Sequence, residues 1–467
     1  MHPTLRARLA RLGPITLLAV LSAVPQCIVP PSAHAVSPPP VDKTLLPAAA
    51  PPAPPRPTVQ REVCTVPAFD PQRAGAPTQL DGLGLPAVWR LSRGAGQRVA
   101  VIDTGVAPHR RLPGLVAAGD YVSTGDGTQD CDGHGTLVAG IVAARPYSAA
   151  DKFSGVAPDA TVIAIRQSST RFGAADDPSR VGVGDVDTLA AAVRTAADLG
   201  ASVINISSVA CAPVASGLDD RALGAALAYA VDVKNAVVVA AAGNTGDGQA
   251  CPAQGDHAGG VTVAVSPAWY DDYVLTVGSV NGDGAPSAFT LPSPWVDVAA
   301  PGEAVLSLSP VGDATTNAAD TVGSQRAPAP ISGTSYAAPV VSGVAALVRS
   351  RFPAWSARQV MDRIRATAHR PPGGHDRFIG DGVVDPLAAV SADTPAPAAP
   401  GPVGAPPPLD VPPAAPTQEP SGRTAALTGA AALLAALALA LTAHAAMGRL
   451  GSSRRPGVPG IDHVPGD

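Results

Sequence analysis

The stretch Val101-Ile102-Asp103-Thr104-Gly105-Val106 places an acidic residue at the end of a short apolar run, directly before a glycine turn. Such a run predicts a strand that is buried on both faces, here Val99–Asp103. Further short apolar runs alternate with segments of helical periodicity along the chain. This alternation predicts an α/β fold with a mostly parallel sheet and helices on both faces. Asp103 would then lie at the carboxyl edge of the sheet, where ligands bind in such folds.

The same reasoning places the remaining elements. We expect the other strands at Thr161–Ile165, Ser202–Ser207, Ala236–Ala242, Val274–Val277 and Trp295–Val298. We expect the helices at Thr136–Ala144, Val186–Leu199, Asp219–Val233, Tyr336–Arg351 and Ser356–Ala368.

Two glycine-rich motifs precede predicted helices and carry reactive side chains. In Asp132-Gly133-His134-Gly135-Thr136, glycines leave an imidazole accessible just before a helix. A metal site built on Asp132 and His134 is an alternative, but further ligands at suitable spacing and an HExxH pattern are missing from the sequence. In the second motif, Ile331-Ser332-Gly333-Thr334-Ser335, the last serine falls at a helix N-terminus, where free N–H groups favour a developing anion. By itself, this serine is better explained as an ordinary helix cap.

Taken together, the motifs predict nucleophilic catalysis. A serine hydroxyl needs a base to take its proton, and the base needs a carboxylate to fix its tautomer. Asp103, His134 and Ser335 supply these three groups in that order. Asn244 follows Gly243 at the end of another predicted strand, so its amide can donate to an oxyanion together with the Ser335 backbone N–H. An aspartic protease based on Asp103-Thr104-Gly105 is a weaker alternative, because that chemistry needs two such carboxylates.

The composition excludes some classes of function and divides the chain into segments. The formal net charge is −5 over 467 residues, which argues against a nucleic-acid-binding face. The 48 glycines and 52 prolines are concentrated partly in segments that are poor in large apolar residues. Ser37–Pro57 and Thr394–Pro420 are therefore expected to be extended, semi-rigid spacers on either side of a globular core.

The two ends of the chain predict export and membrane attachment. A basic region precedes an apolar run over Ile15–Val24, and the small-residue pattern Ala33-His34-Ala35 follows, which is typical of a cleaved signal peptide; an uncleaved anchor is the alternative. Ala425–Met447 has no Asp, Glu, Lys or Arg and would span ~34 Å as a helix, enough for a ~30 Å hydrocarbon core. Arginines follow it, so the C-terminus is expected in the cytoplasm and the main domain outside; a soluble Ala-rich helix is the alternative. The expected organisation is a signal peptide (1–35), a Pro-rich arm (36–79), a catalytic domain (80–393), a linker (394–424), a transmembrane helix (425–447) and a short tail (448–467).

Four cysteines, Cys64, Cys131, Cys211 and Cys251, remain after removal of the signal peptide. An even number in an exported domain suggests disulfides, and three pairings are possible. We favour Cys211–Cys251, because both residues follow strands that are expected to be neighbours in the sheet. Cys64–Cys131 would then tie the arm to the loop before His134. Four separate buried thiols are the alternative.

The three ordered motifs resemble those of the subtilisin-like serine proteases. The resemblance implies a three-layer α/β fold in which Asp103 orients His134, His134 acts as base and then acid, Ser335 attacks, and Asn244 completes the oxyanion hole. It also implies substrate binding near Ser207, Ser208 and Gly243, although Ser207-Ser208-Val209 departs from the frequent Ser-Leu-Gly of that family. The sequence shows no calcium-binding loop pattern, so we expect no metal and no cofactor.

The signal peptide, the arm with Cys64, Asp130-Cys131-Asp132 and the single C-terminal span resemble the mycosin branch, the membrane-anchored proteases of type VII secretion systems. This resemblance implies an endopeptidase on the outer side of the cytoplasmic membrane. It would process secreted polypeptides and associate with the secretion complex, and its arm would wrap the catalytic domain. The alternative is a mainly scaffolding subunit in which proteolysis is secondary.

Overall fold

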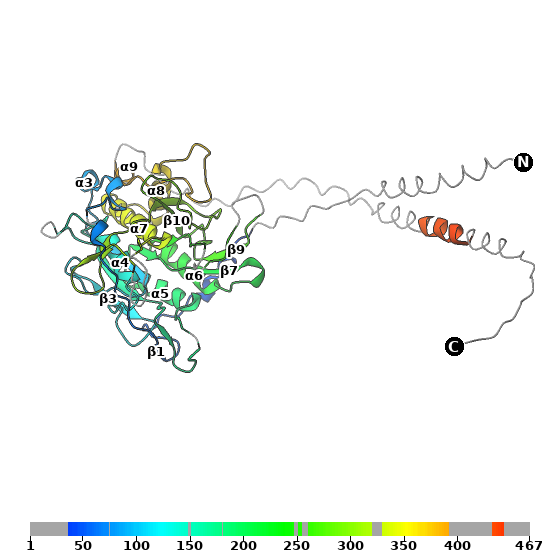
Figure 1. Cartoon of the computed structure of the whole chain (residues 1–467), viewed down its shortest axis with the longest axis horizontal. Helices are drawn as coiled ribbons and strands as arrows, with labels where there is room; N and C mark the ends of the chain where they lie inside the picture. The colour runs from blue at the N-terminus through cyan, green and yellow to red at the C-terminus, as the bar shows by residue number, and fades with distance from the viewer. Residues whose placement is uncertain are drawn as a thin grey trace, which may run out of the picture. The chain divides into compact units, whose positions relative to one another are not determined.

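The computed structural model describes residues 36–391 and 432–442, apart from 74, 148–150, 180, 247–250, 255–259 and 320–328. Its centre is a seven-stranded sheet in the order β11-β10-β8-β6-β2-β4-β3, in which every neighbouring pair is parallel. Figure 1 labels two of its strands, β3 and β10. The strands of this sheet are β2 (Arg98–Asp103), β3 (Val116–Asp120), β4 (Thr161–Arg166), β6 (Val203–Ile206), β8 (Val237–Ala241), β10 (Leu275–Val280) and β11 (Val298–Pro301).

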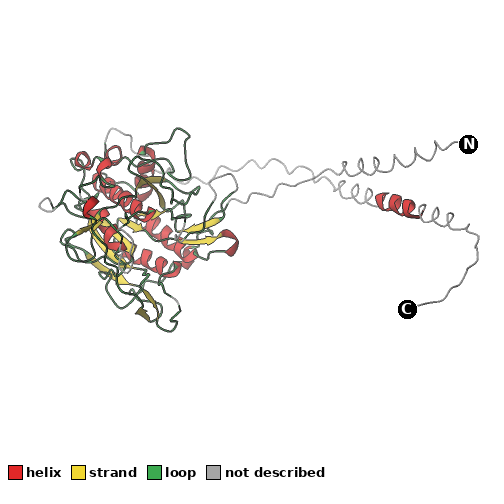
Figure 2. Ribbon diagram, in the orientation of Figure 1, coloured by secondary structure: helices red, strands yellow, loops and turns green. Residues whose placement is uncertain are grey.

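Two groups of helices pack against this sheet (Figure 2). In the first group, α7 (Thr334–Arg351) lies against β6, β8 and β10 and is flanked by α4 (His134–Ala143) and α8 (Ala357–Thr367). In the second group, α5 (Val186–Asp198) lies against β2, β4 and β6 and is flanked by α6 (Arg221–Ala228), which continues as the π-helical turn η5 (Tyr229–Val233). The short helices are η1 (Lys43–Leu45), η2 (Pro71–Arg73), η3 (Asp81–Leu83), α3 (Leu85–Val88), η4 (Val214–Ser216) and α9 (Pro386–Val390).

Three small antiparallel pairs complete the described structure. They are β1 (Thr58–Gln60) with β5 (Phe172–Ala174), β7 (Ala210–Pro213) with β9 (Val263–Ser266), and β12 (Ser307–Leu308) with β13 (Thr315–Thr316).

Local sequence signals explain where these elements begin. All five residues of β8 are buried, as expected for a parallel strand that is covered on both faces. Helix α5 starts at a capping box in which the Asp185 side chain accepts from the Thr188 backbone N–H and the Thr188 side chain bonds back to the Asp185 backbone. Ser356 and Gln359 form the same arrangement at the start of α8.

Most predicted strands are confirmed with shifts of one to three residues at their ends, but the last one is displaced. We expected a strand at Trp295–Val298, whereas β11 begins at Val298. The Asp297 side chain, just before this strand, accepts a hydrogen bond from the Thr276 backbone N–H at 2.7 Å. The short strand β3 was not predicted, because it contains Gly119 and only one β-branched residue.

The Pro-rich segment 37–57 is not the free spacer that its composition predicted. Val41 and Leu46 pack against the main core, and the Pro47 carbonyl accepts from the Arg194 guanidinium at 2.8 Å. Pro52 lies so close to Gly119 that a Cβ on that glycine would meet the Pro52 Cγ at 2.2 Å. A chain with few large side chains therefore docks through prolines and backbone carbonyls, which a hydrophobicity argument overlooks.

The residues from Pro400 onward form a second unit. Residues 432–442 of this unit are helical, and the helices of the described residues include none that is long and apolar enough to cross a bilayer. The expected signal peptide (1–35), linker (394–424) and tail (448–467) lie outside the described residues, as do the two ends of the expected span (425–447).

Candidate active site

Asp103 and His134 meet at the carboxyl edge of the sheet. Asp103 is the last residue of β2, and His134 is the first residue of α4. The His134 Nδ1 lies 2.7 Å from the Asp103 Oδ1. The Asp103 side chain is only 2% exposed, whereas that of His134 is 27% exposed. The carboxylate is thus enclosed, while the imidazole remains accessible to a ligand.

Ser335 lies on the other side of the imidazole, in the first turn of α7. Its Oγ is 3.0 Å from the His134 Nε2, within hydrogen-bond distance. Gly333, which precedes this helix, keeps the space around the hydroxyl open. A Cβ at Gly333 would stand 3.1 Å from the Ser335 Oγ and 3.4 Å from the Asn244 Nδ2.

The environment of His134 changes its basicity. Burial lowers the pKa of His134, but the charge of Asp103 and its hydrogen bond more than offset this, with smaller contributions from Asp130 and Asp132, so the pKa lies above its ordinary value. Tyr336 packs beside the imidazole, with ring centroids 4.9 Å apart. Burial, followed by the charges of Asp103 and Asp130, raises the pKa of Tyr336, so its phenol is neutral at physiological pH.

Asn244 is held with its amide nitrogen toward Ser335. It follows β8, and its Oδ1 accepts from the Thr334 backbone N–H at 3.0 Å and from the Thr334 Oγ1 at 2.9 Å. Because the oxygen is occupied in this way, the Nδ2 borders the same open space as the Ser335 hydroxyl, beside Gly333. This arrangement suits the stabilisation of negative charge next to the hydroxyl.

Ser207 is turned into the protein. Its hydroxyl is buried, accepts from the Asn205 Nδ2 at 2.9 Å and donates to the Ser335 carbonyl at 2.9 Å. That carbonyl has no donor within its own helix, because the residue four positions later is Pro339, which lacks an N–H. The Ser207 side chain therefore anchors Ser335 to the end of β6.

The other two residues expected near the substrate, Ser208 and Gly243, lie on the loops that follow β6 and β8. Gly243 has φ +97°, and a Cβ there would stand 3.2 Å from the Cys251 Sγ and 3.6 Å from the Val209 Cγ2. Backbone conformation and close neighbours thus both require glycine at this position.

Asp130 is a site residue whose role the sequence analysis missed. Its carboxylate accepts four hydrogen bonds: from the Thr104 Oγ1 (2.8 Å) and the Gly133 N–H (2.7 Å) through Oδ1, and from the Thr136 N–H (2.8 Å) and Oγ1 (2.6 Å) through Oδ2. The Thr104 hydroxyl in turn accepts from the Gly135 N–H at 2.9 Å. Burial raises the pKa of Asp130, although hydrogen bonds from Thr136 and Thr104 act in the opposite direction. One carboxylate thus joins the loop after Asp103 to the start of the His134 helix. An Asp three residues before Gly133 is the signal that could have revealed it.

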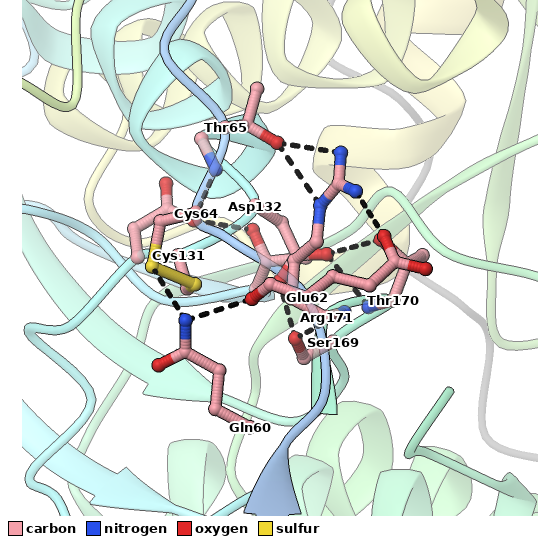
Figure 3. Close-up of a disulfide and its surroundings, with 12 residues drawn as sticks. Gln60, Glu62, Cys64, Thr65, Cys131, Asp132, Ser169, Thr170 and Arg171 are labelled. Atoms are coloured by element: carbon pink, nitrogen blue, oxygen red, sulfur yellow. Dashed lines mark hydrogen bonds and ion pairs between the residues drawn. A yellow bond between two sulfur atoms is a disulfide. The ribbon is translucent and has the colours of Figure 1, made fainter. Parts of the chain in front are cut away.

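Both favoured cysteine pairs are bonded in the structure. Cys64 is joined to Cys131, which brings the arm to the loop before His134, and Cys211 is joined to Cys251 beside Gly243 (Figure 3 shows the first pair). The Asp132 carboxylate, which the alternative metal site would have used, accepts hydrogen bonds from the Ser169 Oγ, the Thr170 N–H at 2.7 Å and the Thr170 Oγ1 at 2.6 Å. Within the part of the chain that the structure describes, three or more His, Cys, Asp or Glu side chains are nowhere arranged to hold a metal ion.

The chain is similar to known proteases. Residues 94–382 match the model of the subtilase family. The chain is 62% identical over 461 residues to Mycosin-4 of Mycobacterium tuberculosis, covering 97% of this chain and 99% of that protein.

Two solved structures are also similar. The MycP3 protease from the type VII (ESX-3) secretion system is 46% identical with a TM-score of 0.70, covering 77% of this chain and all of that one. A chain of the periplasmic assembly from the ESX-5 inner membrane complex is 42% identical with a TM-score of 0.70, covering 81% of this chain and 99% of that one. The chain therefore belongs to the subtilase family of serine proteases, in the mycosin group.

Proposed function

We propose that this protein is a membrane-held serine endopeptidase that cuts polypeptides outside the cytoplasm and is part of a type VII secretion complex. The observation that carries the catalytic part is the continuous line from Asp103 through His134 to Ser335, with separations of 2.7 and 3.0 Å. Its position at the carboxyl edge of the sheet is the ordinary place for a reactive site in this architecture.

Each group has one role in the reaction. The His134 Nε2 takes the proton of the Ser335 hydroxyl while the Oγ attacks the carbonyl carbon of the scissile bond. The Asn244 Nδ2 and the Ser335 N–H donate to the resulting oxyanion. When the C–N bond breaks, the His134 Nε2–H gives its proton to the leaving amine. Water then repeats the sequence on the acyl-enzyme, and Asp103 stabilises the imidazolium in both halves.

The substrate backbone is proposed to pair with the loops after β6 and β8, at Ser207, Ser208 and Gly243. Support comes from their place at the sheet edge, next to the Ser335 carbonyl that Ser207 holds. An extended peptide can add to such an edge through main-chain hydrogen bonds.

The decisive experiment uses a fluorophosphonate probe on the full-length protein in membranes, with the modified residue identified by mass spectrometry. We expect labelling at Ser335, which His134→Ala abolishes. Loss of nucleophile or base costs about 10⁶ in kcat in subtilisin itself, from which this magnitude is borrowed. Labelling elsewhere, or unchanged labelling in His134→Ala, would refute the proposed triad.

The location and partners rest on the terminal segments and on the relatives. A cleaved signal peptide (1–35) and one span (425–447) would leave the catalytic domain outside and the C-terminus in the cytoplasm. The similar chain in the ESX-5 inner membrane complex supports association with a secretion complex. Protease treatment of intact cells should remove an epitope placed before residue 393 and spare one placed after residue 448.

The same ESX-5 relative favours a second function, as a scaffold of the complex with proteolysis secondary. Ser335→Ala separates the two. If secretion continues with this variant but stops when the gene is deleted, the structural duty dominates.

A further inference from the structure

We infer that residues 65–70 of the arm form the wall of the substrate cleft on the side that receives the polypeptide C-terminal to the scissile bond, and that Val66 and Phe69 select apolar residues there. The inference rests on the proposed function, because the side of the cleft is assigned from the proton transfer by which His134 releases the leaving amine.

The chemistry decides which side of the site the leaving segment occupies. The His134 Nε2 must hand a proton to the leaving amine, so this nitrogen has to come within about 2.6–3.2 Å of it. The C-terminal half of the substrate therefore begins beside the imidazole and continues past the loop that carries His134.

The arm reaches that same loop. Gly133 is one Cα step of about 3.8 Å from His134. A Cβ on Gly133 would stand 3.4 Å from the Pro67 Cγ of the arm and 3.2 Å from the Pro310 Cγ. With φ +80° at Gly133, close packing and backbone conformation both make this a glycine position. Segment 65–70 thus packs against Gly133, the residue that precedes the general base.

The crossing segment is fixed on both sides. At its first residue, the Thr65 N–H donates to the Cys131 carbonyl at 2.8 Å, next to the Cys64–Cys131 disulfide. Further along the segment, Ala68 and Ala318 exchange two backbone hydrogen bonds of 3.2 Å. Ala318 also forms an antiparallel bridge with Pro330, five residues before Ser335. The arm therefore connects the His134 loop to the chain that leads to the nucleophile.

Charged side chains hold the start of segment 65–70 in place (Figure 3). The Arg171 guanidinium donates to the Thr65 Oγ1 at 3.2 and 2.9 Å and forms an ion pair with Glu62. The Arg171 carbonyl also accepts from the backbone N–H groups of Arg61 and Glu62, at 2.8 and 3.1 Å. These charges are engaged in holding the arm, so the selective groups of the wall are its apolar side chains.

Two such side chains flank Pro67 and Ala68. Val66 is 49% exposed and Phe69 is 48% exposed, although both belong to a segment that is held at both ends. Half-exposed apolar residues beside a reactive site are suited to cover apolar groups of a ligand. At ~3.3 Å per extended residue, the second and third residues after the scissile bond occupy the space from ~3 to ~10 Å beyond the leaving nitrogen. We assign these two residues to the wall.

The test uses the full-length protein in membranes and two readouts. The first is the rate of Ser335 labelling by a fluorophosphonate, a probe without a peptide segment on the leaving side. The second is mass-spectrometric sequencing of cleavage sites in a peptide library made from denatured proteins. The variants are Phe69→Ser, Val66→Ser and Phe69→Lys, with Val59→Ser as matched control, because Val59 is an exposed valine of the same arm that lies in β1.

We expect the wild type to favour Leu, Ile, Phe and Val at the second and third positions after the cut. Phe69→Ser should reduce this preference about tenfold, Val66→Ser about threefold, and Phe69→Lys should shift it toward Asp and Glu. The rate of Ser335 labelling should stay within twofold of that of the wild type, and such a rate also shows that the variant is correctly folded. Val59→Ser should change neither the labelling rate nor the cleavage preference.

Equal selection by wild type and Phe69→Ser, with Ser335 labelled normally in both, would overturn the inference alone. Failure of the wild type to label at Ser335 would instead overturn the proposed function, and the inference with it.

Discussion

Replacement of Asp130 by Asn removes one charge from the network behind His134 and keeps the shape of the side chain. The carboxylate accepts two hydrogen bonds at each oxygen, whereas an amide has only one oxygen and can accept only one of these two pairs. If its oxygen faces Thr136, the Thr104 hydroxyl can reorient but the Gly133 N–H loses its acceptor. An unsatisfied buried N–H costs about 1–3 kcal/mol, and a hydrogen bond that loses its charged partner weakens by roughly 1 kcal/mol. These two losses sum to about 2–4 kcal/mol. Because the variant no longer desolvates a charge, we expect a smaller net loss of about 1–3 kcal/mol in the free energy of unfolding.

The same substitution should be visible in catalysis. Gly133 adjoins His134, and a misplaced catalytic group can cost up to about 10²-fold, so kcat should fall roughly 10–100-fold. The charge of Asp130 raises the pKa of His134, so its removal lowers that pKa and moves the acid limb of the kcat/KM profile to lower pH. Urea unfolding and a pH series on a peptide substrate measure both effects.

Asp126→Asn is the matched control for Asp130→Asn. Asp126 accepts from the Thr128 N–H at 2.9 Å and the Thr128 Oγ1 at 2.6 Å, but on the surface. We expect a change within about 0.5 kcal/mol and an unmoved pH profile. If Asp130→Asn behaves like this control, or if its acid limb moves to higher pH, the reasoning about the network is wrong.

Three further predictions concern the arm, the oxyanion site and a buried acid. Replacing Cys64 and Cys131 by Ser should lower the free energy of unfolding by up to about 4 kcal/mol, from the loop entropy of a 67-residue separation; equal urea midpoints for the variant and the oxidised wild type would contradict this. Thr334→Val removes one of two hydrogen bonds that orient Asn244, so kcat should fall roughly 3–10-fold with KM unchanged, as steady-state kinetics can check. Burial raises the pKa of Asp297 to about 8, so the stability that this group contributes is complete below its unfolded pKa near 4 and is lost as pH rises through 8. Asp297→Asn should therefore flatten the fall in stability between pH 5 and 8; a fall as steep as that of the wild type in urea titrations would exclude this origin.

The strands and the reactive residues were predictable for the same physical reason. A parallel strand is a continuous apolar run, and its polar end marks the sheet edge, so the sequence alone places Asp103 and Asn244 at that edge. The spatial meeting of these residues with His134 and Ser335 followed from the family pattern, because residue spacing alone does not determine a distance.

The features that were missed depend on contacts that sequence patterns do not encode. The role of Asp130 arises from four donors on two separate segments, which only the folded chain brings together. The docking of segment 37–57 uses proline surfaces and carbonyl oxygens, so a composition that predicts an unfolded spacer also fits a bound strap. The Ser207 side chain points inward because it donates to the Ser335 carbonyl, which Pro339 leaves without its i+4 donor in a different element, α7.

That last contact has a mechanical consequence for the nucleophile. An ordinary helix of 18 residues is about 27 Å long, and each of its peptide groups moves with the next turn through i to i+4 hydrogen bonds. Pro339 interrupts this coupling at the carbonyl of Ser335, and Ser207 attaches that carbonyl to the central sheet instead. A bend of α7 at its proline would therefore not have to pull the Ser335 carbonyl away from the end of β6. The nucleophile belongs by sequence to a long helix, but its carbonyl is held by the central sheet.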